Sequence, residues 1–361
     1  MISTLLVMDW GFFIEKMVLI VSVVSISLVI AMYETYAERK VAAVMQDRRG
    51  PNRAGPFGIL QPLADGLKLF MKEEIIPNTS NKFLFVLGPC LAMLTAMMTS
   101  AVIPWGDKIH FTLFGQDRYV NLQIADINIG ILYIFGVVSM GVYGIMIGGW
   151  ASNNKFSLIA ALRGASQVIS YEIPMGLSLI ALLMLTGSLK MSVIVGNQLD
   201  NWYYVLYQPL GFFIFLICAF AECNRTPFDL PEAENELNFG YHQEYSSMKL
   251  GFYLFAEYVN MFISSAVMVT LFWGGYDIPF VNDAALGKNI GMNWMAILQG
   301  FTMFVKVAIF IFFFMWVRWT IPRFRYDQLM NLGWKKLIPL ALVNMIITAA
   351  IVLLKQNGWK F

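Results

Sequence analysis

Acidic residues gather between two apolar stretches in the second half of the chain, from Ala221 to Glu257. The series comprises Glu222, Asp229, Glu232, Glu234, Glu236, Glu244 and Glu257. An ionised carboxylate beside hydrocarbon is costly unless it is paired, hydrated or protonated, so selection for stability alone would remove it. Crowded carboxylates also raise one another's pKa, as a proton relay near neutral pH requires. The alternative is a solvated acidic loop that docks on a basic partner subunit or on the chain's own arginines.

Two other carboxylates lie inside apolar stretches. Glu172 comes two residues before Pro174, whose ring bends a helix and frees backbone groups, so a Glu facing the bundle there is a functional candidate. Arg163 or a basic loop residue is its expected partner, and a neutral Glu bonded to the broken turn is the alternative. Glu257 has the same two interpretations, with Lys306 expected either as its partner or as a cation of the proton path.

Two carboxylate pairs fall at helical spacing. Glu34 and Glu38 are four residues apart, so they share one helix face and can act as a coupled pair with raised pKa values. Glu232 and Glu236 would stack in the same way if a short helix starts after Pro231, a residue favoured at the first helical position. The spacing therefore predicts two local carboxylate pairs.

The expected counterpart of the acidic stretch is a basic segment near the C-terminus. Arg318, Arg323 and Arg325 follow one another closely, and guanidinium groups hold carboxylates with two parallel hydrogen bonds. The alternative is that these arginines only fix the orientation of the chain in a bilayer.

The elements that position these residues are predicted to be membrane-spanning helices. The chain has 361 residues, of which 58% are hydrophobic and 13% charged, with a mean hydropathy of +0.63. This composition excludes an ordinary soluble domain and predicts an all-α polytopic membrane protein. Eight stretches have the length of about 20 residues that a bilayer requires. They are Phe12 to Tyr36, Phe83 to Ile103, Ile127 to Trp150, Leu158 to Thr186, Tyr203 to Ala221, Met248 to Trp273, Met295 to Trp319 and Leu337 to Leu354.

The basic residues predict the orientation of these helices. Most of the 25 Lys and Arg residues lie in or beside the loops after the first, third, fifth and seventh stretches. The positive-inside rule then puts both termini on the outer side. The first stretch is too long for a cleaved signal peptide, so it is expected to remain as a helix.

The first basic loop, residues 37–82, is expected to contain a helix that lies along the membrane surface. Leu60, Leu63, Leu67 and Phe70 recur at helical spacing, and the charged residues between them lie on the other face. Such a helix would roof an entrance from the lipid, or it is a plain surface helix.

Several other functions lack their motifs. Cys90, Cys218 and Cys223 have no metal-binding spacing, so we expect small apolar side chains and no metal on this chain. The sequence has no phosphate-binding glycine loop and no hydrolase triad. The net charge of +2 gives no indication of a nucleic-acid partner.

Several blocks of sequence are distinctive when taken together. The blocks are Glu38-Arg39-Lys40, Arg49-Gly50-Pro51-Asn52, Leu60-Gln61-Pro62-Leu63-Ala64-Asp65-Gly66-Leu67-Lys68, Ser170-Tyr171-Glu172, Asn224-Arg225-Thr226-Pro227-Phe228-Asp229-Leu230, Ala256-Glu257-Tyr258 and Pro322-Arg323-Phe324-Arg325-Tyr326-Asp327-Gln328. Together they resemble a known family, the quinone-site membrane subunit of respiratory complex I, the proton-pumping NADH:quinone oxidoreductase. They occur in the family's order along nearly the whole chain.

The resemblance implies a single integral membrane domain over residues 1–361 with eight transmembrane helices. Loops 37–82, 222–247 and 320–336 would form the quinone-chamber side. The implied substrate is a quinone, ubiquinone or menaquinone, with FMN and iron–sulfur clusters on partner subunits of the peripheral and membrane arms. The implied location is a bacterial inner membrane.

The resemblance also implies roles for individual residues. Three would belong to a proton path through the membrane: Glu172, Glu222 and Glu257. Five would be loop carboxylates that sense quinone reduction: Asp229, Glu232, Glu234, Glu236 and Glu244. Six would belong to the quinone chamber and its entrance: Arg39, Arg49, Asp65, Arg225, Arg323 and Arg325.

Two other functions remain as alternatives for the protein. One is the related anchor and proton-conduit subunit of a membrane-bound hydrogenase. The other is a stand-alone ion transporter, which lacks support because no internal repeat is evident.

Overall fold

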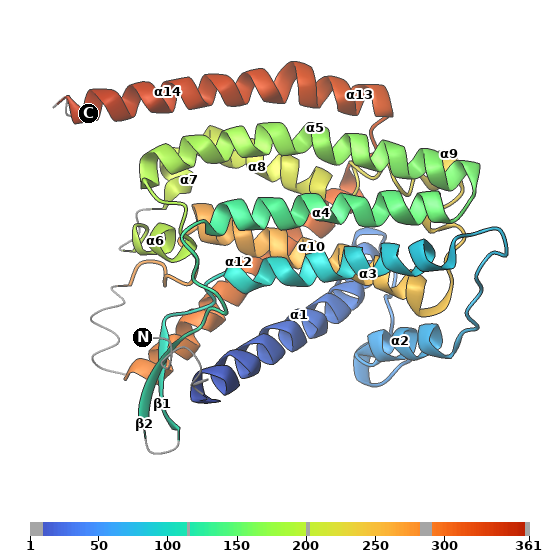
Figure 1. Cartoon of the computed structure of the whole chain (residues 1–361), viewed down its shortest axis with the longest axis horizontal. Coiled ribbons are helices and arrows are strands. Elements are labelled where there is room, and N and C mark those ends of the chain that lie inside the picture. Colours follow the sequence, from blue (N-terminus) through green and yellow to red (C-terminus); the bar gives the residue numbers. More distant parts are fainter. Residues whose placement is uncertain (1–9, 114–115, 200–202, 282–290, 358–361) are drawn as a thin grey trace, which may run out of the picture.

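The long helices run side by side as one bundle (Figure 1). The computed structural model describes residues 10–113, 116–199, 203–281 and 291–357. Within these ranges, seven helical stretches are long and apolar enough to cross a membrane, which confirms an all-α polytopic membrane protein. The long helices are α1 (Trp10–Met45), α3 (Lys82–Thr99), α4 (Gly130–Ala151), α5 (Lys155–Thr186), α10 (Ser247–Phe272), α12 (Met292–Thr320) and α14 (Ile338–Gln356).

The remaining predicted span is a broken helix. α7 (Tyr204–Tyr207) and α8 (Pro209–Glu222) are separated at Gln208, whose backbone leaves the helical region at φ −134°. Pro209 then begins α8, as proline favours the first turn. The 14 residues of α8 extend about 21 Å at 1.5 Å per residue, less than a bilayer core of about 30 Å. The fifth predicted segment is therefore a short apolar helix that ends at Glu222.

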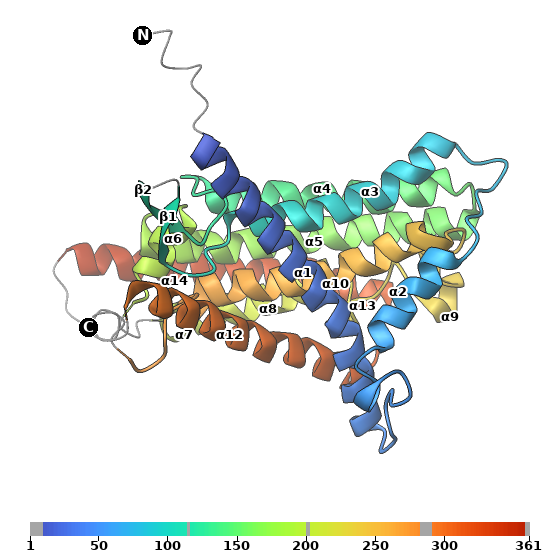
Figure 2. The same cartoon turned by 90° about the horizontal axis from the view of Figure 1, so that it is seen from below.

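Shorter elements lie at the two ends of the bundle. The hairpin of β1 (Lys108–Leu113) and β2 (Gln116–Asn121) is antiparallel, with Lys108 opposite Asn121. It lies at the end where α1 begins and α14 finishes (Figures 1 and 2). The opposite end carries α2 (Gln61–Met71), α9 (Glu234–Leu237) and α13 (Tyr326–Asn331). The connections also contain α6 (Met191–Gly196), the 3-10 turns Pro56–Gly58, Ser100–Val102 and Gly240–His242, and the π-helix Leu332–Leu337.

Two of the predicted loops are shorter than expected. α1 continues to Met45, so Glu38 and Arg39 lie on the helix and not in the following loop. No glycine or proline occurs between Gly11 and Gly50, so nothing local stops the helix earlier. The loop predicted over 320–336 already becomes helical at Tyr326, after Pro322.

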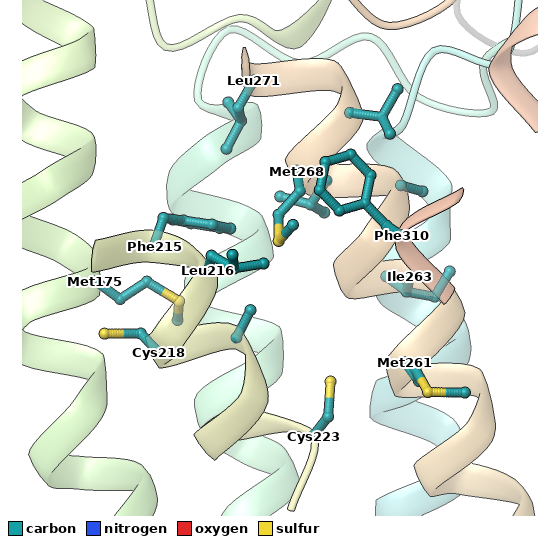
Figure 3. Close-up of a cluster of buried hydrophobic side chains, with 14 of the residues drawn as sticks. Met175, Phe215, Leu216, Cys218, Cys223, Met261, Ile263, Met268, Leu271 and Phe310 are labelled. Atoms are coloured by element: carbon teal, nitrogen blue, oxygen red, sulfur yellow. The ribbon is translucent and has the colours of Figure 1, made fainter. Parts of the chain in front are cut away.

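The apolar core surrounds the broken helix α8. Phe215 and Leu216 of α8 lie among Met175 of α5, Met268 of α10 and Phe310 of α12 (Figure 3). Cys218 and Cys223 are free, buried thiols in the same region, whereas Cys90 is exposed. Helix packing in a membrane depends on close van der Waals contact, and this core holds the C-terminal end of α8 in a defined place.

Helices α3 and α4 approach closely through glycine. A Cβ atom at Gly144 would lie 2.8 Å from the backbone nitrogen of Ala92 and 3.0 Å from the carbonyl oxygen of Gly88. Small residues permit this kind of backbone contact between helices. The hydroxyl of Tyr253 donates to the Gly144 carbonyl at 3.0 Å, which ties α10 to the same pair.

Candidate functional site

Arg225 is the centre of a buried charge cluster at the end of α8. Its side chain is 4% exposed, and its Nη1 lies 3.6 Å from Oε2 of Glu38. Its Nη2 lies 4.0 Å from Oε2 of Glu257. The guanidinium carbon lies 4.1 Å above the centre of the Tyr258 ring, within the range of a cation–π contact. One cation thus faces carboxylates from α1 and α10.

Glu38 joins three parts of the chain in this cluster. It forms an ion pair with Nη1 of Arg318 at 2.5 Å and accepts a hydrogen bond from the hydroxyl of Tyr258 at 2.8 Å. Glu34 lies one helical turn before it and is buried, and neither of its carboxylate oxygens has a hydrogen-bond partner among the described residues. The predicted pair is therefore asymmetric, because only Glu38 is held by cations.

Glu257 connects this cluster to the acidic loop. The hydroxyl of Tyr241 lies 3.3 Å from Oε1 of Glu257. The residue after Tyr241, His242, is completely buried, and its Nδ1 lies 3.6 Å from Oε1 of Glu232. Burial lowers the pKa of His242 to about 3, because the charged imidazolium loses its hydration. His242 is thus a neutral imidazole at pH 7.

Asp229 is a loop carboxylate whose burial favours its protonated form. Its side chain is 2% exposed, and Oδ2 lies 2.5 Å from Nη2 of Arg323. Burial raises the pKa of Asp229 to about 8, the negative charge of Glu232 adds to this, and Arg323 opposes it. A carboxyl group with such a pKa exchanges a proton near neutral pH.

Two small cavities with some polar groups in their walls continue from Glu257 toward the middle of the bundle. The first has a volume of about 50 Å³, and its wall includes Glu257, Glu222 and Tyr241. The second has a volume of about 30 Å³, and both are lined by Glu222, Thr99 and Asn260. Each exceeds the ~15 Å³ that one water molecule needs, so water can connect these groups.

Glu172 lies farther along this series, on α5. The hydroxyl of Ser139 on α4 donates to its Oε1 at 2.8 Å. Its negative charge is near enough to act on Glu222 at the end of α8. The expected partner of Glu172 was wrong, because Arg163 pairs instead with Glu236 at 2.6 Å.

The expected partner of Glu257 was also wrong. Lys306 lies near the end of α10, where its Nζ donates to the carbonyl oxygens of Trp273, Gly275 and Asp277 at 2.8, 3.1 and 2.7 Å. Trp273 follows Glu257 by about 24 Å along a helix that rises 1.5 Å per residue. The backbone carbonyl groups at the end of α10 accept the hydrogen bonds of Lys306, and Glu257 faces Arg225 instead.

The remaining predicted residues lie around the cluster. Nδ2 of Asn154 donates to Glu244 at 2.8 Å, and Arg39 pairs with Asp65 at 2.6 Å. Arg49 is exposed in the loop after α1, and Arg325 is exposed beside Asp327. The backbone of Glu234 begins α9, and its side chain lies outside the described part of the structure.

The predicted basic counterpart of the acidic loop is partly confirmed, whereas the predicted stacking of Glu232 with Glu236 is wrong. Arg323 does pair with Asp229, whereas Arg318 contacts Glu38. The short helix starts at Glu234 and not directly after Pro231, and Glu232 lies beside His242 while Glu236 points to Arg163. The two carboxylates therefore do not stack.

Gln167 is a site residue that the sequence did not reveal. Its Nε2 lies 2.7 Å from the Ala221 carbonyl and 2.6 Å from the Phe228 carbonyl, which fixes the loop after α8 against α5. Tyr241, Tyr258 and His242 were also missed as parts of the cluster. Their sequence signals are that Tyr241 and His242 lie within the acidic stretch and that Tyr258 belongs to one of the family blocks.

A separate apolar groove opens beside the cluster. It has a volume of about 380 Å³ and lies between α1, α2, α3 and α10. Leu63, Leu67 and Phe70 of α2 line it, opposite Met32 of α1 and Phe255 of α10. Figure 2 shows α2 alongside the last turns of α1 and the first turns of α10. The amphipathic face predicted for α2 thus covers a cavity.

Comparison with known proteins gives a consistent result. The family described as NADH dehydrogenase matches residues 17–349. The chain is 64% identical to an H-type subunit of NADH-quinone oxidoreductase from Cytophaga hutchinsonii, over 95% of this chain and 98% of that relative. It is 63% identical to the corresponding subunit of Flavobacterium johnsoniae over 96% of this chain and 97% of that relative. The relative of the same type from Geobacter metallireducens is 47% identical over 96% and 98% of the two chains.

Proposed function

The chain belongs to the NADH dehydrogenase family as a membrane subunit of a proton-translocating NADH:quinone oxidoreductase, and from this premise we propose that its buried carboxylates couple quinone reduction to proton movement. The enzyme acts on a quinone and requires other subunits, so this subunit is not catalytic alone. No observation favours the hydrogenase-type or transporter alternatives, since relatives named as NADH-quinone oxidoreductase subunits cover nearly the full chain.

The proposed function also implies an orientation of this subunit in the membrane and a set of partners. We propose that the end carrying α2, α9 and α13 faces the peripheral arm and forms part of the quinone chamber. The basic residues concentrated in the loops at this end support an inner membrane orientation with both termini outside. Lipid, quinone and subunits of both arms are the proposed contacts.

The observation that carries the proposal is the continuity of the charge cluster. Asp229 and Glu38 lie on the chamber side and face Arg323 and Arg225. Glu257 adjoins Arg225, and two cavities lead from it to Glu222 and toward the helix that bears Glu172. Reduction of a quinone consumes two electrons and two protons, so it changes the charge beside this cluster. Carboxylates at short intervals can pass that change inward as protonation steps.

Glu172→Gln tests the inner end of this relay. Glutamine keeps the size and can still accept from Ser139, but it carries no exchangeable carboxyl proton. We expect proton pumping driven by NADH in vesicles to fall by about tenfold, because general acid–base groups typically contribute at least that much. Asp126→Asn is the matched control, since Asp126 pairs with Lys190 at the other end of the bundle. Unchanged quinone reduction and pumping in Glu172→Gln would refute its role.

The apolar groove is the proposed path by which a quinone tail enters from the lipid. Its lining is almost entirely apolar, and α2 lies over it as a surface helix. A long isoprenoid tail gains free energy from such a surface at about 25 cal/mol per Å² removed from water. The quinone head would then reach the charged end of the bundle beside Arg39 and Asp65.

Leu67→Trp is expected to narrow this groove. The larger side chain should raise the KM for a long-tailed quinone about tenfold, because overpacking costs about 1–3 kcal/mol. The KM for a short-tailed quinone should change much less. Met71→Trp on the same helix is the control, because Met71 is 84% exposed and does not line the groove. Equal effects on both quinones would argue against this entrance.

A further inference from the structure

His242 occupies an unusual position for a buried polar side chain. It is fully buried between aromatic rings, with its centroid 3.8 Å from Tyr241 and 5.4 Å from Tyr253. Neither ring nitrogen has a hydrogen-bond partner among the described residues. A buried polar group without a partner destabilises a fold, so such a group calls for a ligand or a function. Its Nδ1 lies 3.6 Å from a carboxylate oxygen of Glu232.

A third group completes a compact set of ligand atoms. One nitrogen of His242 and one oxygen each of Glu232 and Glu257 lie within 4.8 Å of one another. Ligands of a tetrahedral Zn²⁺ lie about 2.0–2.2 Å from the metal, and hence about 3.4 Å apart. Small rotations of the two flexible Glu side chains would close the remaining difference. The three residues come from the loop, the 3-10 turn and α10, so the fold itself brings them together.

We propose that Glu232, His242 and Glu257 form a binding site for one divalent transition-metal ion of the Zn²⁺ type. One imidazole and two carboxylates form a mixed nitrogen and oxygen set, and three protein ligands leave a fourth position open for water. The imidazole favours Zn²⁺, Co²⁺ or Ni²⁺ over Mg²⁺ and Ca²⁺, which prefer oxygen ligands alone. The neutral ring of His242 presents a lone pair without first losing a proton.

Metal binding would have a regulatory consequence, which rests on the proposed relay. Glu257 contacts both Arg225 and Tyr241, so a metal that takes one of its oxygens competes with these partners. The metal would also hold Glu232 of the acidic loop. A bound ion thus removes two adjacent carboxylates from proton exchange and inhibits quinone reduction reversibly.

Equilibrium dialysis of the purified, assembled complex with ⁶⁵Zn²⁺ tests the site directly, after exposure to a chelator. The His242→Asn variant keeps a small polar side chain and should bind one Zn²⁺ fewer per complex, or bind it at least about tenfold more weakly. Glu232→Gln should show the same loss. Glu236→Gln is the control, because this loop carboxylate pairs with Arg163 outside the set. The same number of ions bound with the same affinity in both ligand variants would overturn the site.

A second measurement distinguishes Zn²⁺ binding from the inhibition of quinone reduction. Quinone reduction is titrated with ZnCl₂ in the wild-type complex and in His242→Asn, with NADH oxidation by a water-soluble artificial acceptor as the reference reaction. Loss of both binding and inhibition in the variant supports the site and its regulatory effect. Loss of binding with unchanged inhibition keeps the site and overturns the regulation. If His242→Asn does not assemble, Glu232→Gln answers the binding question alone.

Discussion

Glu222→Gln is expected to lower quinone reduction and the associated proton pumping by at least about tenfold, because a general acid–base group typically contributes 10²-fold or more. Glu222 ends α8 and lines both small cavities between Glu257 and the middle of the bundle. The negative charge of Glu172 also acts on Glu222. Glutamine preserves its shape but cannot release and recover a proton. A single replacement here therefore interrupts the series on both sides.

The measurement requires the assembled enzyme in sealed vesicles. The rate of NADH oxidation by quinone and the proton gradient are recorded together, and oxidation by an artificial acceptor shows that the enzyme is intact. Glu222→Asp should recover part of the activity, since it restores a carboxyl group with a shorter reach. Asp126→Asn again serves as the matched control. If Glu222→Gln pumps at the normal rate, protons do not pass through this position.

Arg225→Met is expected to destabilise the complex by about 3–5 kcal/mol, the typical effect of breaking a buried ion pair on one side. The methionine would leave Glu257 without its nearest cation, while Glu38 would keep only Arg318. It would also remove the cation–π contact with Tyr258. The remaining carboxylates would have to bind protons or admit water, and the loop after α8 would loosen.

Thermal unfolding of the complex and the amount assembled in membranes test this expectation. The stability of Arg225→Lys should lie between those of the wild type and Arg225→Met, because lysine keeps the charge but not the planar, two-sided contact. Arg48→Met is the control, since Arg48 is exposed and the hydrogen bond given for its side chain goes to nearby Gln46. Exposed positions of this kind usually change stability by less than about 0.5 kcal/mol. Equal stability of Arg225→Met and Arg48→Met would contradict a central role for Arg225.

The helices were predictable because their signals are local. The length and composition of an apolar run such as Met248 to Trp273 are enough to predict a helix. The structure places α10 within one residue of both ends. The amphipathic spacing of Leu63 and Leu67 likewise predicted α2. The exception was the fifth span, where Pro209 breaks the run and leaves a short α8. A backbone break depends on packing as well as on the proline itself.

The sequence alone determined that this protein is a bundle of membrane helices with too many carboxylates for a purely structural role. It also provided the blocks that connect it with its family. The tertiary structure decided which charges meet. Arg225 lies between Glu38 and Glu257. Arg163 forms an ion pair with Glu236, and Lys306 donates hydrogen bonds to the carbonyl groups at the end of α10.

The physical reason lies in the range of the forces. Hydrophobic length and helical periodicity are properties of neighbouring residues, whereas a charge pair forms between side chains that only helix packing brings together. Gln167 shows the same limit, because a lone glutamine in an apolar stretch gives no sign that it will hold the Ala221 and Phe228 carbonyls. The carboxylates of the acidic stretch could be named from the sequence, but their partners depended on the fold.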